Sequence, residues 1–184
     1  MTQPQPQRTG IDAQEVERLR STMRGPLLRA GDEGFEIARK IHNGTIDQRP
    51  AVIARCAGVA DVLRALDFSV SKGLPISIRC GGHGLPGSAV CDGGLMIDLE
   101  TMNGVHVDPA ALTARTHGGT NWGHFDHETQ AFRLATTGGL VRTTRIAGLT
   151  LSGGHGFLMR KFGLACDNLI SADVVTAHGR LVKA

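Results

Sequence analysis

The chain has 184 residues, of which 41% are hydrophobic and 20% charged, and its formal net charge is +3. This length suits one domain or slightly more, with enough apolar residues for a core. Charges of one sign do not gather in runs and aromatic residues make up only 4%, which excludes a basic nucleic-acid-binding stripe. No apolar stretch approaches the roughly 18 residues of a membrane-spanning helix. The four cysteines form no CxxC pair, so we expect free thiols and a cytoplasmic location.

The first part of the chain predicts helices followed by a β–α–β unit. Residues 1–10 form a polar tail, and Asp12 and Glu15 have the spacing of a capping box for a helix over 14–23. A short helix is predicted at 35–41, a strand at 51–55, an amphipathic helix at 62–72 that ends at Gly73, and a strand at 76–79. We therefore divide the chain into a tail with one helix, residues 1–34, and a main domain, residues 35–184.

The rest of the chain alternates short strands with glycine turns. We predict a buried strand at 95–99, two strands at 104–107 and 112–116, a helix at 122–130 capped by Asn121, and a short strand at 134–135. One helical turn at 158–162, a strand at 169–176 and a hairpin turn at 177–180 complete the chain. The mixture predicts an α+β fold, with a small lobe that contains the β–α–β unit and a larger lobe of strands and glycine turns.

A glycine-rich loop follows the predicted strand at 76–79. It reads Arg79-Cys80-Gly81-Gly82-His83-Gly84. Glycine lets a ligand approach the backbone, successive N–H groups bind anions, and an arginine suits a phosphate. The Gly-Leu-Pro-Gly that comes next cannot start a long helix, which disfavours a Rossmann dinucleotide site. Taken alone, this loop is either a phosphate-binding loop or an ordinary turn between strands.

Further glycine turns occur at 118–119, 136–139 and 148–156. Several such turns together favour an extended cofactor, because a dinucleotide needs one loop for its pyrophosphate and others for its two ends. His83 has three interpretations, which are a histidine bonded to the backbone, a metal ligand, or a nucleophile joined to a cofactor. His124 and His127 lack a matching carboxylate, so we assign no metal site. Arg142 and Arg145 are candidates to meet a phosphate, with solvated arginine as the alternative.

Two long stretches, 49–109 and 135–182, resemble a known family. They are similar to the FAD-binding (PCMH-type) domain of the vanillyl-alcohol oxidase superfamily, and within it to berberine-bridge-enzyme-like and 6-hydroxy-D-nicotine-oxidase-like FAD-linked oxidases. The motifs that carry the resemblance are the loop at 79–83, the R-K-F-G-L at 160–164 and the D-N-L-I-S-A-D-V-V-T-A-H-G at 167–179. The resemblance implies an α+β fold of two subdomains that hold FAD between them. Members continue well beyond the hairpin, so we expect a C-terminally incomplete fold.

The resemblance also implies the site residues. Arg79–His83 would wrap the pyrophosphate, and His83 would be bonded to the 8α-methyl group of the flavin. A second covalent bond would need a cysteine within 139–144, which has none, so we expect a single bond. Cys80, Arg145 and His155 depart from the residues that are usual at these positions. The FAD-binding residues carried over are Arg79, Cys80, Gly81, Gly82, His83, Gly84, Gly118, Thr137, Gly138, Thr144, Gly148, Ser152, Gly153, Gly154 and Val174.

The function implied is that of the FAD-binding part of a flavin-dependent oxidase. Such an enzyme takes a hydride from a C–H bond next to oxygen or nitrogen in a small-molecule substrate and passes the electrons to O₂. The family's catalytic bases lie mainly beyond the matched region, so we assign no catalytic residue and expect this chain alone to lack a substrate domain. The alternatives are a truncated nucleotide-binding module and an inactive fragment without redox turnover. The substrate and the oligomeric state are left open.

Overall fold

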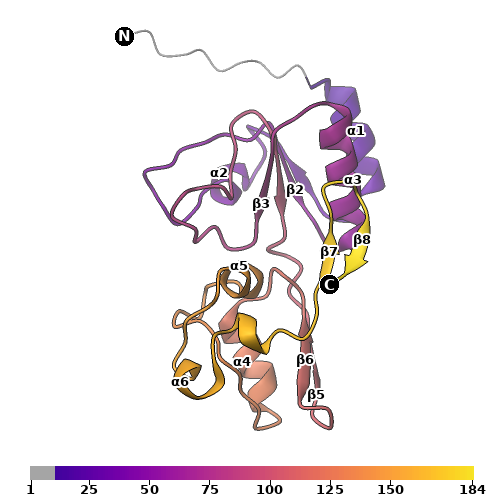
Figure 1. Ribbon diagram of the computed structural model, residues 1–184. Coiled ribbons are helices and arrows are strands. Elements are labelled where there is room, and N and C mark those ends of the chain that lie inside the picture. The colour runs from indigo at the N-terminus through magenta and orange to yellow at the C-terminus, as the bar shows by residue number, and fades with distance from the viewer. Residues whose placement is uncertain (1–10) are drawn as a thin grey trace.

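The computed structural model describes residues 11–184, which form two lobes and a C-terminal hairpin (Figure 1). We call residues 11–100 the sheet lobe, residues 101–172 the glycine lobe and residues 173–184 the C-terminal hairpin. The predicted polar tail at 1–10 lies outside the described residues. Among the helices of residues 11–184, none combines the length and the apolar character that crossing a membrane requires.

The sheet lobe is built on a four-stranded sheet. Its order is β1 (Leu27–Leu28), β2 (Val52–Arg55), β4 (Leu95–Asp98) and β3 (Ile76–Arg79). β2 and β3 both run parallel to β4, and β1 pairs antiparallel with β2. The elements of the predicted β–α–β unit are therefore confirmed, but β4 lies between its two strands. β4 is buried along its whole length, as expected of a central parallel strand covered on both faces.

Helices cover both faces of this sheet (Figure 1). α1 (Ala13–Thr22) and α3 (Val59–Ser71) pack on one face, and α2 (Phe35–Ala38) packs on the other. Asp12 caps α1 by accepting from the Gln14 amide, whereas Glu15 pairs with Lys72 on the C-terminal cap of α3, so the capping box is not closed. α3 starts at Val59, earlier than predicted, and ends before Gly73, whose φ is +61°.

The residues before position 35 belong to the same core. Val16 and Leu19 of α1 and Leu27 of β1 are buried in one cluster with the sheet strands. The division predicted after residue 34 does not coincide with a break in this core. β1 escaped prediction because a two-residue strand carries no periodicity.

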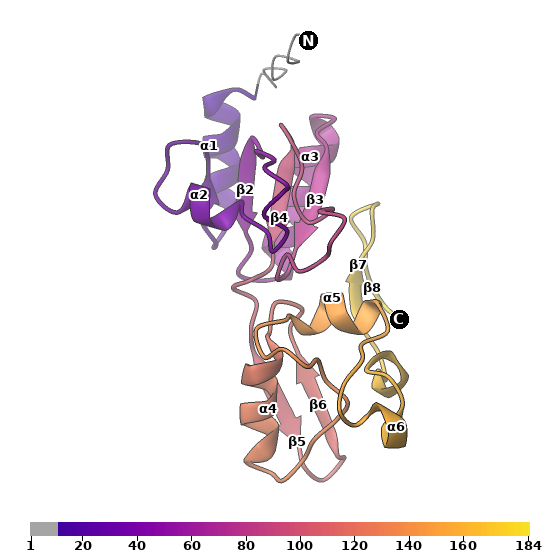
Figure 2. The ribbon, with the colours of Figure 1, turned by 90° about the vertical axis from the view of Figure 1, so that its left-hand side faces the viewer.

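The glycine lobe pairs β5 (Val105–Asp108) antiparallel with β6 (Thr113–Thr116), and α4 (Trp122–Gln130) packs along β5 (Figure 2). The two strands and α4 are confirmed, including the cap, since Asn121 Oδ1 accepts from the His124 amide at 2.7 Å. α5 (Ile146–Leu151), α6 (Met159–Phe162) and a 3-10 turn at Cys166–Asn168 complete the lobe.

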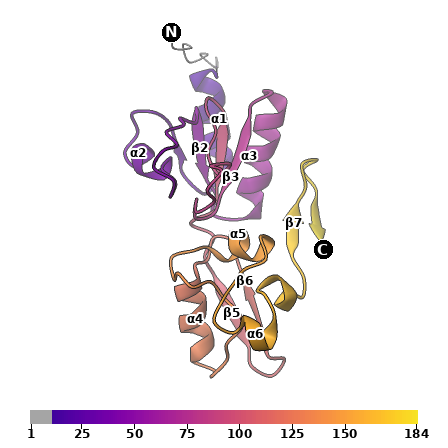
Figure 3. The same cartoon turned by 60° about the vertical axis from the view of Figure 1, so that its left-hand side comes forward.

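Three sequence-based expectations are corrected. The strand predicted at 134–135 is wrong, because that segment forms an extended loop with no ladder partner among residues 11–184. Residues 148–151 belong to α5 rather than to a turn, since Ile146 and Thr150 bury one face at helical spacing. The strand predicted at 169–176 shortens to β7 (Asp173–Val175), which pairs with β8 (Leu181–Lys183) in the predicted hairpin. This hairpin stands beside α3 (Figure 3).

Candidate cofactor site

The short helix α5 is the meeting point of the glycine turns. It lies between the two lobes (Figures 2 and 3). A Cβ added at Gly81 would come 2.7 Å from Cγ of Arg145, the residue that precedes α5, and one added at Gly118 would come 3.4 Å from Cβ of Ala147. Leu149 on α5 closes on two further turns, 2.8 Å from a Cβ at Gly139 and 2.6 Å from one at Gly154. Glycine at these places allows turns from both lobes to reach one helix.

We call residues 79–84 the His83 loop. It packs against Ile41 and His42, which lie in the segment between α2 and β2. Gly82 has φ +64°, a left-handed conformation that favours glycine, and a Cβ there would meet Ile41 at 3.0 Å. The Gly82 carbonyl accepts from the His42 amide at 2.9 Å. Within residues 11–184, the amides of Gly81 to Gly84 donate no hydrogen bond. Four successive amides without an acceptor are suited to an anion.

The His83 side chain is half-buried and fixed in orientation. Its ring stacks on that of His42, with centroids 5.0 Å apart and planes 20° apart. Burial, then the neighbouring His42 and Arg145, lowers the pKa of His83, so the ring is neutral at neutral pH. Neutral imidazole is the nucleophilic form. Among residues 11–184, no group of three or more His, Cys, Asp or Glu side chains is placed to hold a metal ion.

Arg79 is placed differently from a simple phosphate ligand. Its side chain is buried, and Nη1 donates to Asp98 Oδ1 at 3.1 Å and to Glu100 Oε2 at 3.0 Å. The guanidinium therefore ties the start of the His83 loop to the end of β4. Its phosphate-binding role stays a prediction. The groups of this loop that are suited to a phosphate are the neighbouring amides of Gly81 to Gly84, which donate no hydrogen bond within residues 11–184.

Several buried polar atoms near α5 have no partner among the described residues. Thr137 is fully buried and its hydroxyl is unsatisfied, as are Trp122 Nε1, Arg79 Nε and Arg145 Nε. Buried polar atoms in folded proteins are nearly always hydrogen-bonded. These side-chain atoms could donate to an anion, and so could the amides of the His83 loop. Together they fit an extended anionic cofactor such as a dinucleotide.

Most of the remaining predicted positions lie near α5 or in the His83 loop, and one lies on the C-terminal hairpin. Gly153 and Gly154 have φ of +97° and +84°, and both carbonyls accept amides from the chain after α6, which closes the turn that follows Ser152. The Thr144 carbonyl accepts from the Trp122 amide at 3.1 Å, and Gly148 faces open space on α5. Cys80 is half-buried, and burial raises the pKa of its thiol. Val174 lies elsewhere, on β7 in the hairpin beside α3.

Sequence reasoning missed two residues that shape this site. His42 stacks on His83, and Glu100 accepts hydrogen bonds from Arg79 and Arg145. Neither carries a local signal, because each acts on residues that are 21 to 45 positions away in the chain. The convergence of glycine turns was the only feature that pointed to their surroundings.

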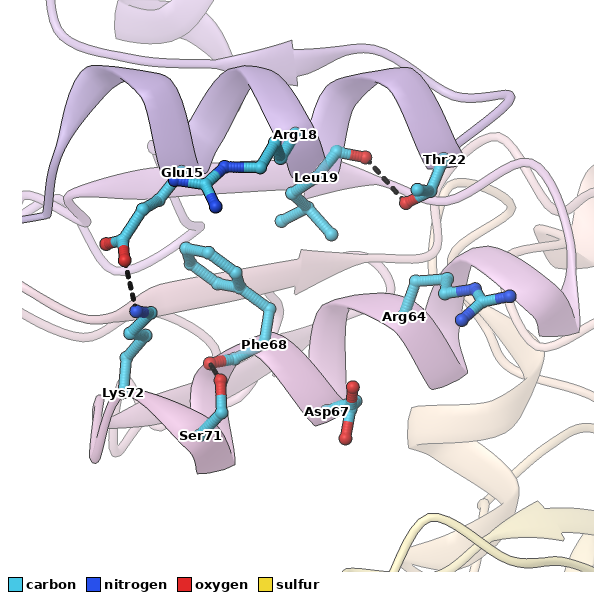
Figure 4. Close-up of a pocket in the computed structure, with 9 residues that line it drawn as sticks. All are labelled: Glu15, Arg18, Leu19, Thr22, Arg64, Asp67, Phe68, Ser71 and Lys72. Atoms are coloured by element: carbon cyan, nitrogen blue, oxygen red, sulfur yellow. Dashed lines mark hydrogen bonds and ion pairs between the residues drawn. The ribbon is translucent and has the colours of Figure 1, made fainter.

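Two hollows of the surface lie away from this junction. A pocket of about 270 Å³ opens between α1 and α3, with Leu19 and Phe68 facing it and the Glu15–Lys72 ion pair at one end (Figure 4). A second hollow of about 600 Å³ lies between α3 and the hairpin turn at His178. Neither is lined by any of the predicted site residues.

The chain matches a family model described as an FAD binding domain over residues 50–184. Among curated proteins it is similar to (R)-6-hydroxynicotine oxidase of Paenarthrobacter nicotinovorans, with 40% identity over 88% of this chain and 35% of the relative. It is also similar to an FAD-linked oxidoreductase of Dictyostelium discoideum, with 33% identity over 92% of this chain and 37% of the relative.

Solved structures give the same picture. The crystal structure of 6-hydroxy-D-nicotine oxidase from Arthrobacter nicotinovorans superposes with a TM-score of 0.86 and 40% identity, over 88% of this chain and 36% of that one. Wild-type BBE-like 1 of Physcomitrella patens superposes with a TM-score of 0.86 and 28% identity, over 92% and 37%. The chain thus spans little more than a third of the length of these relatives.

Proposed function

Since this chain belongs to the FAD binding domain family of FAD-linked oxidoreductases, we propose that it holds FAD where the two lobes meet, with the pyrophosphate on the His83 loop. The observation that carries this placement is the run of four amides, Gly81 to Gly84, that donate no hydrogen bond within residues 11–184. Arg145, the residue that precedes α5, lies directly against this loop. The Thr137 hydroxyl, which has no partner among the described residues, offers a further polar contact.

His83 is the residue we propose for covalent attachment of the flavin. The stacked His42 ring restricts its orientation, and burial keeps its imidazole neutral by lowering its pKa. A fixed, neutral imidazole meets the needs of a nucleophile. No cysteine occurs within 139–144, so the proposal is for one covalent bond and not two.

When bound, FAD supplies the redox chemistry, which is acceptance of a hydride from a C–H bond next to oxygen or nitrogen and delivery of electrons to O₂. The part of this chain is to bind the cofactor, to orient it between the lobes and to hold the His83 ring unprotonated. A small-molecule substrate is proposed for the complete enzyme. The relatives are almost three times as long as the matched stretch, and substrate turnover is not proposed for these residues alone.

The test is to add FAD to the purified chain, to measure binding by the absorbance and fluorescence of the flavin, and then to denature the protein. We expect the wild-type polypeptide to stay yellow and to gain the mass of FAD. His83→Ala should abolish the covalent fraction and keep reversible binding. His127→Ala, at an exposed histidine of α4 that lies outside the predicted site, is the matched control and should stay covalently flavinylated.

Each outcome separates two possibilities. Reversible FAD binding without covalent attachment in the wild type would remove the tether and keep the binding site. Tight binding of adenine nucleotides in preference to FAD would favour a nucleotide-binding module. A chain that stays colourless in excess FAD would refute the placement of the cofactor.

A further inference from the structure

Five charged side chains form a cluster that crosses from one lobe to the other. We call Arg55, Arg79, Asp98, Glu100 and Arg145 the junction cluster. Glu100 is its centre, since Oε1 accepts from Arg145 Nη2 at 2.7 Å and Oε2 accepts from Arg79 Nη1 at 3.0 Å. Arg55 lies beside both carboxylates, 3.2 Å from Asp98 and 3.5 Å from Glu100. The cluster ties the ends of β2, β3 and β4 to the start of α5.

The charges of the junction cluster do not cancel. Three guanidinium groups face two carboxylates, which leaves one positive charge in excess. The side chain of Asp98 is fully buried, and those of Arg79 and Arg145 are 11% and 15% exposed. Burial raises the pKa of Asp98, so any protonation there only adds to the excess. An unbalanced charge in such a setting is unfavourable unless an anion lies near.

The excess charge lies against the His83 loop. The Cβ and Cγ atoms of Arg145 would be 3.5 and 2.7 Å from a Cβ at Gly81, so this side chain covers the loop backbone. Arg145 acts to lower the pKa of both Cys80 and His83, which places its charge within reach of the loop. The Nε donors of Arg79 and Arg145 are buried and have no acceptor in the described part of the chain.

We propose that Arg145 is a positioning residue of the cofactor site: held by Glu100, it fixes the His83 loop against α5 and gives the loop the net positive charge that selects a diphosphate. The proposal rests on the proposed function in taking the FAD diphosphate as the natural occupant. Its charge requirement is measurable without the flavin, since inorganic pyrophosphate carries the same group.

The experiment measures binding of inorganic pyrophosphate and of FAD to the full 184-residue chain by calorimetry, at low and at moderate salt. Arg145→Gln should lose about tenfold or more in affinity for both, because it removes a charged partner of the anion, and its affinity should depend less on salt. Arg145→Lys keeps the charge and should stay within about threefold of wild type. Arg133→Gln removes the same charge from an exposed residue of the glycine lobe that lies outside the predicted site and is the matched control, expected within about twofold.

A second readout follows the His83 ring by NMR in the chain without ligand. Arg145→Gln should raise the pKa of His83, whereas Arg145→Lys and Arg133→Gln should leave it near the wild-type value. A loss of packing alone would not be restored by lysine. If Arg145→Gln fails to fold, as judged by circular dichroism, Arg145→Lys decides the matter, because a tenfold loss in that variant contradicts the need for charge.

Three results would overturn the proposal. The first is pyrophosphate binding by Arg145→Gln within twofold of wild type, and the second is an equal loss in Arg133→Gln. Failure of the proposed function looks different, since the wild type would then bind pyrophosphate with this pattern of variants but would not bind FAD. The third result is equal FAD affinity in wild type and Arg145→Gln, which would reject the role of Arg145 and leave FAD binding intact.

Discussion

The sheet lobe and the glycine lobe are held together in different ways. The sheet lobe buries clusters of ten and five apolar residues on the two faces of its sheet, whereas the cluster of the glycine lobe has only four, so most of the burial lies in the first. Large apolar side chains of the glycine lobe lie open instead, with Phe157 88% and Leu151 78% exposed. Apolar burial is the main stabilising term in folding, and it is concentrated in the sheet lobe.

Close backbone contact at glycine occurs in both lobes, at Gly25 and Gly94 in the sheet lobe and at Gly119 and Gly156 in the glycine lobe. A Cβ at Gly119 would come 1.8 Å from the Leu99 carbonyl oxygen, and one at Gly156 would come 1.9 Å from that of Gly138. Chain segments this close leave no room for a side chain at these glycines. The difference between the lobes is thus one of task, because a rigid scaffold positions loops that carry the binding groups.

The most severe test of this contrast is removal of core volume from the sheet lobe. Leu95→Ala on β4 should lower the free energy of unfolding by about 2–5 kcal/mol, because it leaves a cavity where a fully buried side chain was. Leu151→Ala in the glycine lobe removes an exposed leucine and should change it by about 0.5 kcal/mol or less. Urea unfolding followed by circular dichroism measures both. Similar losses in the two variants would contradict the unequal distribution of stability.

A smaller effect concerns the polar anchor of the sheet lobe. Asp61 in the first turn of α3 is buried and accepts from the amides of Arg24, Gly25 and Ala57. Burial alone would raise the pKa of Asp61, but these three hydrogen bonds outweigh it and lower the pKa. Asp61→Asn should lower the free energy of unfolding by about 1–3 kcal/mol at pH 7, because it leaves a buried amide without a charged acceptor.

The pH dependence has a definite sign. Since the folded pKa of Asp61 lies below the unfolded value of about 3.9, its contribution is complete above about pH 5 and is lost as pH falls through the folded pKa. The difference in free energy of unfolding between wild type and Asp61→Asn should therefore become smaller in acid. Asp67→Asn, on the exposed side of the same helix, should not lower the free energy of unfolding. A gap that is constant with pH would argue that the anchor is not the carboxylate.

The fold was predictable where local pattern and packing agree. The spacing around 62–72, the apolar run at 95–99 and the Asn121 cap each correspond to an element that the structure contains. The order of strands was not predictable, because nothing local says that β4 inserts between β2 and β3. The segment at 134–135 failed for the converse reason, since two apolar residues indicate a strand only where a neighbour pairs with them.

The candidate site was predictable in its glycines and not in its charges. Glycine turns are visible in the sequence, and the structure gathers those at Gly81, Gly118 and Gly154 around α5. The role of Glu100 required the lobes to be placed together, because its partners Arg79 and Arg145 come from different lobes. Long-range ion pairs leave no periodic trace in a sequence.

The finest test of the contrast between the lobes is Gly148→Ala, where stability and binding should move in opposite directions. Gly148 lies within α5, and a Cβ there would meet nothing within 4 Å. Alanine in a helix is more favourable than glycine by about 0.5–1 kcal/mol, so the unfolding temperature of the cofactor-free chain should rise slightly. If the open space beside Gly148 is filled by FAD, the added methyl group should weaken FAD binding severalfold. Gly44→Ala in the sheet lobe, also in open surroundings, should leave FAD affinity unchanged. A Gly148→Ala protein that is stabilised and still binds FAD like the wild type would remove this face of α5 from the cofactor site and confine the site to the His83 loop.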